Sequence, residues 1–114
     1  MDRVLITPCG KRVVVNTAKD TCLYKTPCNP PNTGTDYTRG TDLYAHRARS
    51  GNVYFYLHHW TLWQGEGSWL ELIGWQEALD FLLEKARLTN VAAMDEDEIE
   101  KAKEFGFNIL EETA

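Results

Sequence analysis

Residues 43–63 read LYAHRARSGNVYFYLHHWTLW, and this stretch decides the fold class. Aromatic and aliphatic side chains, which favour β-strands, recur through residues 43–49 and 53–63. Between these two runs, Ser50-Gly51 is typical of the tight turn of a β-hairpin. The stretch therefore predicts two antiparallel strands joined by a short loop.

The length of that loop decides which side chains share a face of the sheet. A two-residue loop at Ser50-Gly51 pairs Arg49 with Asn52, and opposed residues point to the same side. One predicted face then holds Tyr44, His46, Ala48, Val53, Phe55 and Leu57, and resembles a core. The other holds Leu43, Ala45, Arg47, Tyr54, Tyr56, His58 and Trp60. A one-residue slip in register, or a bulge near His58-His59, would exchange the two sets.

Strands are predicted on both sides of this hairpin, and helices after it. Short β-branched runs within residues 3–24 predict a hairpin that a third strand extends into a meander. Residues 27–42 are rich in proline, glycine and threonine and predict a long loop. Residues 69–73 predict a further strand, and the apolar spacing changes to a helical period over 75–88 and 95–105. We predict a single α+β domain with a twisted antiparallel sheet of five or six strands and two C-terminal helices on one face.

The helix ends carry signals of their own. Asp95 and Glu98 have the spacing of a capping box, and Gly106 is placed to end the second helix. Beyond it, Phe107, Ile109 and Leu110 suggest a short strand, a packed tail or a self-association surface.

Composition and charge restrict the class of protein. The 114 residues include 43% hydrophobic and 25% charged side chains, with a net charge of -5, as in an ordinary globular domain. Residues 1–50 carry a balance of +4, whereas residues 91–114 carry -6. The overall sign disfavours nucleic acid as a partner, although a basic N-terminal half can still present one basic face. We expect no membrane association and a cytoplasmic location, because no segment has the apolar length of a span or of a secretory signal.

Metal, cofactor and nucleophile motifs are missing from the sequence. Cys9, Cys22 and Cys28 form an odd set without CxxC spacing and are expected to be free thiols. Adjacent His58 and His59 point to opposite sides of a strand, which disfavours a shared metal ion. We expect no metal and no cofactor.

Two functions remain open. The first is a non-catalytic binding or interaction module of undetermined ligand, which uses the loop 27–42 and an aromatic sheet face beside basic groups. Its candidate binding residues are Arg39, Arg47, Tyr54, Tyr56, His58 and Trp60. Burial of the same aromatic face under another layer or in a homodimer explains these residues better than ligand stacking does. The alternative is a phosphodiester-cleaving or nucleic-acid-binding protein, with His46 or His59 as acid-base groups and Arg39, Arg47 or Arg49 holding phosphate.

Overall fold

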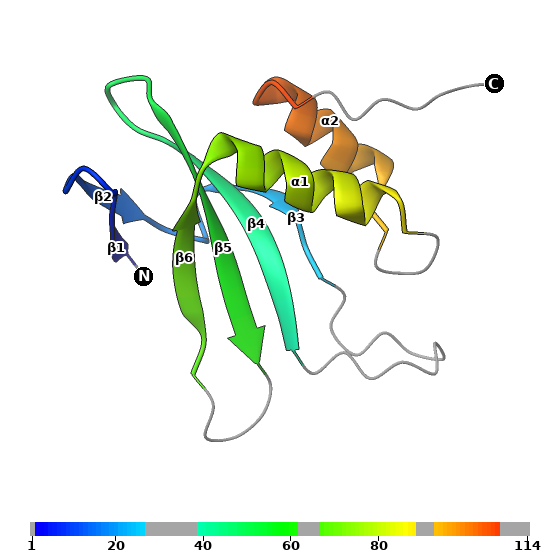
Figure 1. Ribbon diagram of the computed structural model, residues 1–114, viewed down its shortest axis with the longest axis horizontal. Helices are drawn as coiled ribbons and strands as arrows, with labels where there is room; N and C mark the ends of the chain where they lie inside the picture. The colour runs from blue at the N-terminus through cyan, green and yellow to red at the C-terminus, as the bar shows by residue number, and fades with distance from the viewer. Residues whose placement is uncertain (1, 27–38, 62–66, 89–92, 108–114) are drawn as a thin grey trace.

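The fold is α+β, as predicted, and a computed structural model describes residues 2–26, 39–61, 67–88 and 93–107 (Figure 1). The sheets contain six strands and are followed by two helices. Their bounds are β1 Arg3–Ile6, β2 Arg12–Val15, β3 Thr21–Tyr24, β4 Arg39–Arg47, β5 Val53–Thr61, β6 Trp69–Ile73, α1 Trp75–Ala86 and α2 Glu96–Glu104.

The strands form two sheets rather than the single sheet that the sequence predicts. β1 and β2 make a separate two-stranded hairpin, and the other four strands form an antiparallel sheet in the order β3-β4-β5-β6. β3 pairs with β4 and does not extend the first hairpin into a meander. The predicted loop 27–42 extends too far, because its last four residues belong to β4, which begins at Arg39. Its residues 27–38 lie outside the described residues.

The β4–β5 hairpin has a three-residue loop, and this corrects the predicted register. The Gly51 amide donates to the Ala48 carbonyl at 3.0 Å, the Ala48 amide donates to the Asn52 carbonyl at 2.8 Å, and Gly51 has φ +93°. The turn over residues 48–51 ends on a left-handed glycine, and the pairing of Ala48 with Asn52 makes the loop one residue longer than expected. His46 therefore pairs with Tyr54, and Tyr44 with Tyr56. The predicted faces are wrong across the strand pair, although the alternation within each strand holds.

One face of the four-stranded sheet packs against both helices, as predicted. Leu43, Ala45 and Phe55 of this face are buried in one cluster with Ala78 and Leu82 of α1 and with Ala102 of α2. Phe107, just after α2, is fully buried and stacks on Trp75 with 5.4 Å between ring centroids. It is a packed residue of the core. Ile109 and Leu110 lie outside the described residues.

The opposite face of the sheet is covered by the β1–β2 hairpin. Val13 and Val15 of β2 are buried against Tyr44 and Tyr56, whose rings stack at 5.4 Å. In Figure 1 this hairpin lies on the β6 side of the larger sheet. The aromatic face is thus an interior layer over much of its area.

The helix boundaries follow the predicted signals closely. Asp95 caps α2: its carboxylate accepts from the Glu98 amide at 2.8 Å, and the Glu98 carboxylate accepts from the Asp95 amide at 3.1 Å. Gly106 follows the helix with φ +88°, a conformation that favours glycine. The capping box and the glycine stop are both confirmed.

Candidate functional site

Asp20, in the turn before β3, is the centre of a polar network on the sheet face that the β1–β2 hairpin covers. Asp20 is held by a local turn in which its amide donates to the Asn16 carbonyl at 2.8 Å, and the Asn16 amide donates to Asp20 Oδ2 at 2.9 Å. Tyr56 Oη donates to the same Oδ2 at 2.7 Å, and His46 Nδ1 lies 2.8 Å from Oδ1. The Asp20 side chain is only 10% exposed. Three donors therefore fix one carboxylate in place.

This arrangement orients the imidazole of His46. A carboxylate only accepts hydrogen bonds, so Nδ1 carries the hydrogen of this contact and Nε2 is the remaining ring nitrogen. Burial, followed by the hydrogen bond to Asp20, raises the pKa of the Tyr56 phenol, which therefore stays protonated as a donor. His46 is partly exposed, with 21% of its side chain accessible.

His46 lines a cavity of about 730 Å³, here called the basic cavity. Its walls come from three places: the start of β2, the end of β4 with its turn, and β5. The lining residues are Lys11, Arg12, Val13, Val14, His46, Arg47, Ala48, Arg49, Ser50, Asn52 and Tyr54. Four of them are cations and none is acidic.

The cations of the basic cavity have no carboxylate partner within the described ranges. All four are exposed, and the ion pairs of this part of the chain involve other residues. Arg47 has a different contact, because its guanidinium lies 5.3 Å from the centre of the Phe105 ring. In a chain of net charge -5, the lining of the cavity thus gathers four cations that no carboxylate of the described residues pairs with.

Two of the predicted binding residues, Arg47 and Tyr54, meet at the basic cavity. They belong to opposite faces by register, and they meet because Arg47 stands at the very end of β4. Arg49, expected to hold phosphate in the alternative function, also lines it. Arg39 opens β4 and pairs with Thr61 at the far end of the strand, away from Arg47.

The other predicted binding residues on β5 are packed against neighbouring residues of the fold. Tyr56 is fully buried and cannot stack on a ligand in this conformation. His58 is partly buried and meets the edge of Tyr44, with 6.4 Å between the ring centroids. Trp60 lies over Gly40 and donates from Nε1 to Asp42 Oδ1 at 3.1 Å. The aromatic part of the predicted site therefore largely stabilises the fold.

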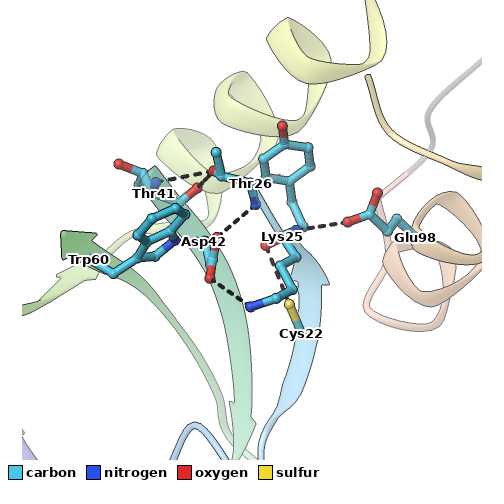
Figure 2. A network of polar contacts seen from close by, with 8 residues as sticks. Cys22, Lys25, Thr26, Thr41, Asp42, Trp60 and Glu98 are labelled. Atoms are coloured by element: carbon cyan, nitrogen blue, oxygen red, sulfur yellow. Dashed lines mark hydrogen bonds and ion pairs between the residues drawn. The ribbon is translucent and has the colours of Figure 1, made fainter. Parts of the chain in front are cut away.

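Asp42 is the centre of the network that holds Trp60 (Figure 2). Its side chain is 1% exposed, and Oδ1 also accepts from the Thr26 amide at 2.7 Å. Oδ2 accepts no hydrogen bond from the described part of the chain but lies 3.7 Å from Lys25 Nζ. The Lys25 amide in turn donates to the Glu98 carboxylate at 2.8 Å. The network ties β3, β4 and α2 together, and we assign it a structural role.

His46 and His59, the two candidate acid-base groups of the alternative function, do not share a face of the sheet. The observed register places His59 opposite Thr41 on the face away from His46. His59 Nδ1 lies 3.1 Å from Thr41 Oγ1, its Nε2 lies 2.9 Å from Glu71 Oε1, and its ring stacks on Trp69 at 4.1 Å. Both nitrogens are engaged, so His59 is a packing residue.

Sequence reasoning missed Lys11, Arg12 and Asp20 as site residues. The excess of basic residues in 1–50 was the available signal for Lys11 and Arg12. Nothing in the sequence indicated Asp20, because its pairing with His46 spans 26 positions and depends on how the β3 turn meets β4.

Comparisons of this chain with models of known protein families, with curated proteins and with solved structures find no match. Within the described residues, no three His, Cys, Asp or Glu side chains are grouped closely enough to hold a metal ion. Neither α1 nor α2, the helices of the described ranges, is long and apolar enough to cross a bilayer.

Proposed function

We propose that this protein is a small binding module that holds a phosphate-bearing ligand in the basic cavity, without catalysis. One observation carries the proposal: four cations, none with a carboxylate partner among the described residues, line one cavity beside an oriented histidine. Arginine guanidinium groups match phosphate oxygens in a bidentate geometry, and lysine adds a point charge. A protonated His46 would add a further donor at Nε2.

Phosphate titration followed by amide NMR tests the proposal. The amides of residues 48–52 should shift on addition of inorganic phosphate at constant ionic strength. Replacing both Arg12 and Arg49 with glutamine removes two charge-assisted contacts, so affinity should fall by about tenfold or more.

A matched control distinguishes binding at the basic cavity from a general effect of positive surface charge. Arg87 is exposed and lies outside the lining of the basic cavity, so Arg87→Gln should change affinity less than about twofold. An effect of Arg87→Gln equal to that of the double Arg12 and Arg49 substitution would overturn the proposal. Failure of the wild-type protein to respond to phosphate would do the same.

We also infer a cytoplasmic location for this module. Cys9 and Cys22, the cysteines of the described residues, are free thiols, as is usual in a reducing compartment. Fractionation of cells that express the tagged chain tests the location, and recovery in an extracellular fraction would contradict it.

Phosphodiester cleavage is a second candidate, favoured by the Asp20–His46 geometry. In such a step His46 Nε2 takes the proton of a ribose 2′-hydroxyl, and O2′ bonds to phosphorus. The P–O5′ bond breaks, and O5′ takes a proton from Lys11. The proton that His46 removed then passes through water to Lys11, which restores both side chains. The binding function is preferred because His46 is the single histidine that lines the cavity as described.

Cleavage of an RNA pool by the purified protein distinguishes the two functions. The second candidate requires cleavage that His46→Gln abolishes and that His58→Gln, away from the cavity, retains. Absence of cleavage by the wild-type protein, or the same cleavage in His46→Gln, would eliminate it.

A further inference from the structure

A second cavity of about 560 Å³ adjoins the basic cavity. The two share Lys11 and Tyr54 as lining residues, and are therefore neighbours. The second cavity, here called the apolar cavity, is bounded chiefly by aliphatic and aromatic side chains, among them Ile6, Phe55, Leu72 and Trp75. It lies where the tip of the β1–β2 hairpin meets β5, β6 and the start of α1.

Two large apolar side chains of this cavity are open to solvent. Ile6 is 59% exposed and Trp75 is 46% exposed, although Trp75 also stacks on Phe107. A half-exposed indole beside an exposed isoleucine offers a flat apolar surface to a planar ring.

The two cavities differ in the charged residues that line them. The basic cavity has four cations and no acid, whereas the apolar cavity has Glu77 and the shared Lys11. An anionic group is therefore favoured in the first and disfavoured near Glu77 in the second. The carboxylate of Glu77 can accept a hydrogen bond from an amino group on a neutral ring. A ligand that spans both cavities has a defined orientation.

We propose that the two cavities form one site for a nucleoside 5′-phosphate, with the phosphate in the basic cavity and the base in the apolar cavity. This inference rests on the proposed function and names its ligand class. Inorganic phosphate would fill only a small part of the combined space, and a base supplies the planar, amine-bearing group that Trp75 and Glu77 suit.

Competing small molecules test the inference directly. We would measure the affinities of adenosine 5′-monophosphate and ribose 5-phosphate by calorimetry at constant ionic strength. The two probes carry the same phosphate and sugar, so their ratio isolates the base. Stacking predicts that the nucleotide binds about tenfold tighter or more.

Variants in the apolar cavity locate the base. Trp75→Leu should reduce the advantage of the nucleotide to less than about threefold while leaving ribose 5-phosphate unaffected, because stacking on the indole is lost. Trp69→Leu is the matched control, since Trp69 is 54% exposed and lines neither cavity. Ile6→Ser changes an exposed lining residue without emptying the core. It should reduce the nucleotide advantage in the same direction, and it replaces Trp75→Leu if that variant does not fold.

The outcomes separate this inference from the proposed function. Equal affinity for both probes, or loss of the nucleotide advantage in Trp69→Leu as well, overturns the nucleotide site and leaves phosphate binding intact. Failure of both probes to bind overturns the proposed function itself.

Discussion

Substitution of Gly40 by alanine should strongly destabilise the fold. Gly40 pairs with Trp60 across β4 and β5, and the indole lies directly over the glycine. A Cβ at this position would lie 2.3 and 2.4 Å from two carbons of the Trp60 ring and 2.8 Å from Thr26 Cβ. These separations are below van der Waals contact, so the ring must move.

The expected loss of unfolding free energy is about 3 kcal/mol, from three contributions. Relief of an overpacked contact typically costs about 1–3 kcal/mol. Movement of the indole breaks its 3.1 Å hydrogen bond to the Asp42 carboxylate, at a cost of roughly 1.5–3 kcal/mol. In the opposite direction, replacing glycine reduces the entropy of the unfolded chain and stabilises the fold by about 0.4–1 kcal/mol.

Urea denaturation of wild type and variant measures the effect. Gly67→Ala is the control, because a Cβ there meets nothing within 4 Å, and we expect its unfolding free energy to stay within about 0.5 kcal/mol of wild type. In a Trp60→Leu background, Gly40→Ala should cost less than in wild type, because the clashing ring is gone and only the 2.8 Å approach to Thr26 Cβ remains. A wild-type-like stability for Gly40→Ala alone would refute the reasoning.

Three further predictions concern other parts of the chain. Glu98→Ala should lower the unfolding free energy by about 1–2 kcal/mol, because its carboxylate no longer accepts from the Asp95 and Lys25 amides. In a Cys28→Ser background, iodoacetamide should modify Cys9 about tenfold faster than Cys22. The Thr7 hydrogen bond lowers the pKa of Cys9, and burial raises that of Cys22. Burial lowers the pKa of His58, so the unfolded chain takes up the proton first as pH falls below about 6.5. Stability should therefore fall between pH 7 and 5 less steeply in His58→Asn.

For each of these three predictions, a specific result would contradict the reasoning. An unchanged urea midpoint for Glu98→Ala would show that neither contact matters in solution. Mass spectrometry of the alkylated peptides would contradict the thiol prediction if Cys22 reacted as fast as Cys9. Equal urea midpoints at pH 5 and 7 in the wild-type protein, or an unchanged slope in His58→Asn, would contradict the histidine prediction.

Local signals predicted most of the fold because they act within a few residues. The Asp95 and Glu98 cap and the Gly106 stop concern neighbouring backbone groups, and both were placed correctly from the sequence. The hairpin register failed for an equally local reason. Ser50-Gly51 fits a two-residue loop and also the last two positions of a three-residue loop. A left-handed glycine suits both loops, so the hydrogen bond from the Ala48 amide to the Asn52 carbonyl is what separates them.

The site was less predictable because it depends on contacts between distant segments. Arg47 and Tyr54 were identified from composition and strand position. No local pattern indicated that the β1–β2 hairpin would cover Tyr56, or that Lys11 and Arg12 would line the same cavity as the β4–β5 turn. Such placements follow from how separate sheets pack, which no periodicity encodes.

Because the aromatic face is covered, residues of the turns form the proposed binding site. Tyr44 and Tyr56 lie between the larger sheet and the β1–β2 hairpin, so their rings contribute packing rather than recognition. Covering that face brings the tip of one hairpin beside the tip of another, and the polar residues of both turns then surround a common space. Lys11 follows a turn in which the Gly10 amide donates to the Thr7 carbonyl at 2.9 Å, and Arg49 lies within the matching turn of β4 and β5. The same packing that removes the aromatic surface from solvent therefore assembles the basic cavity.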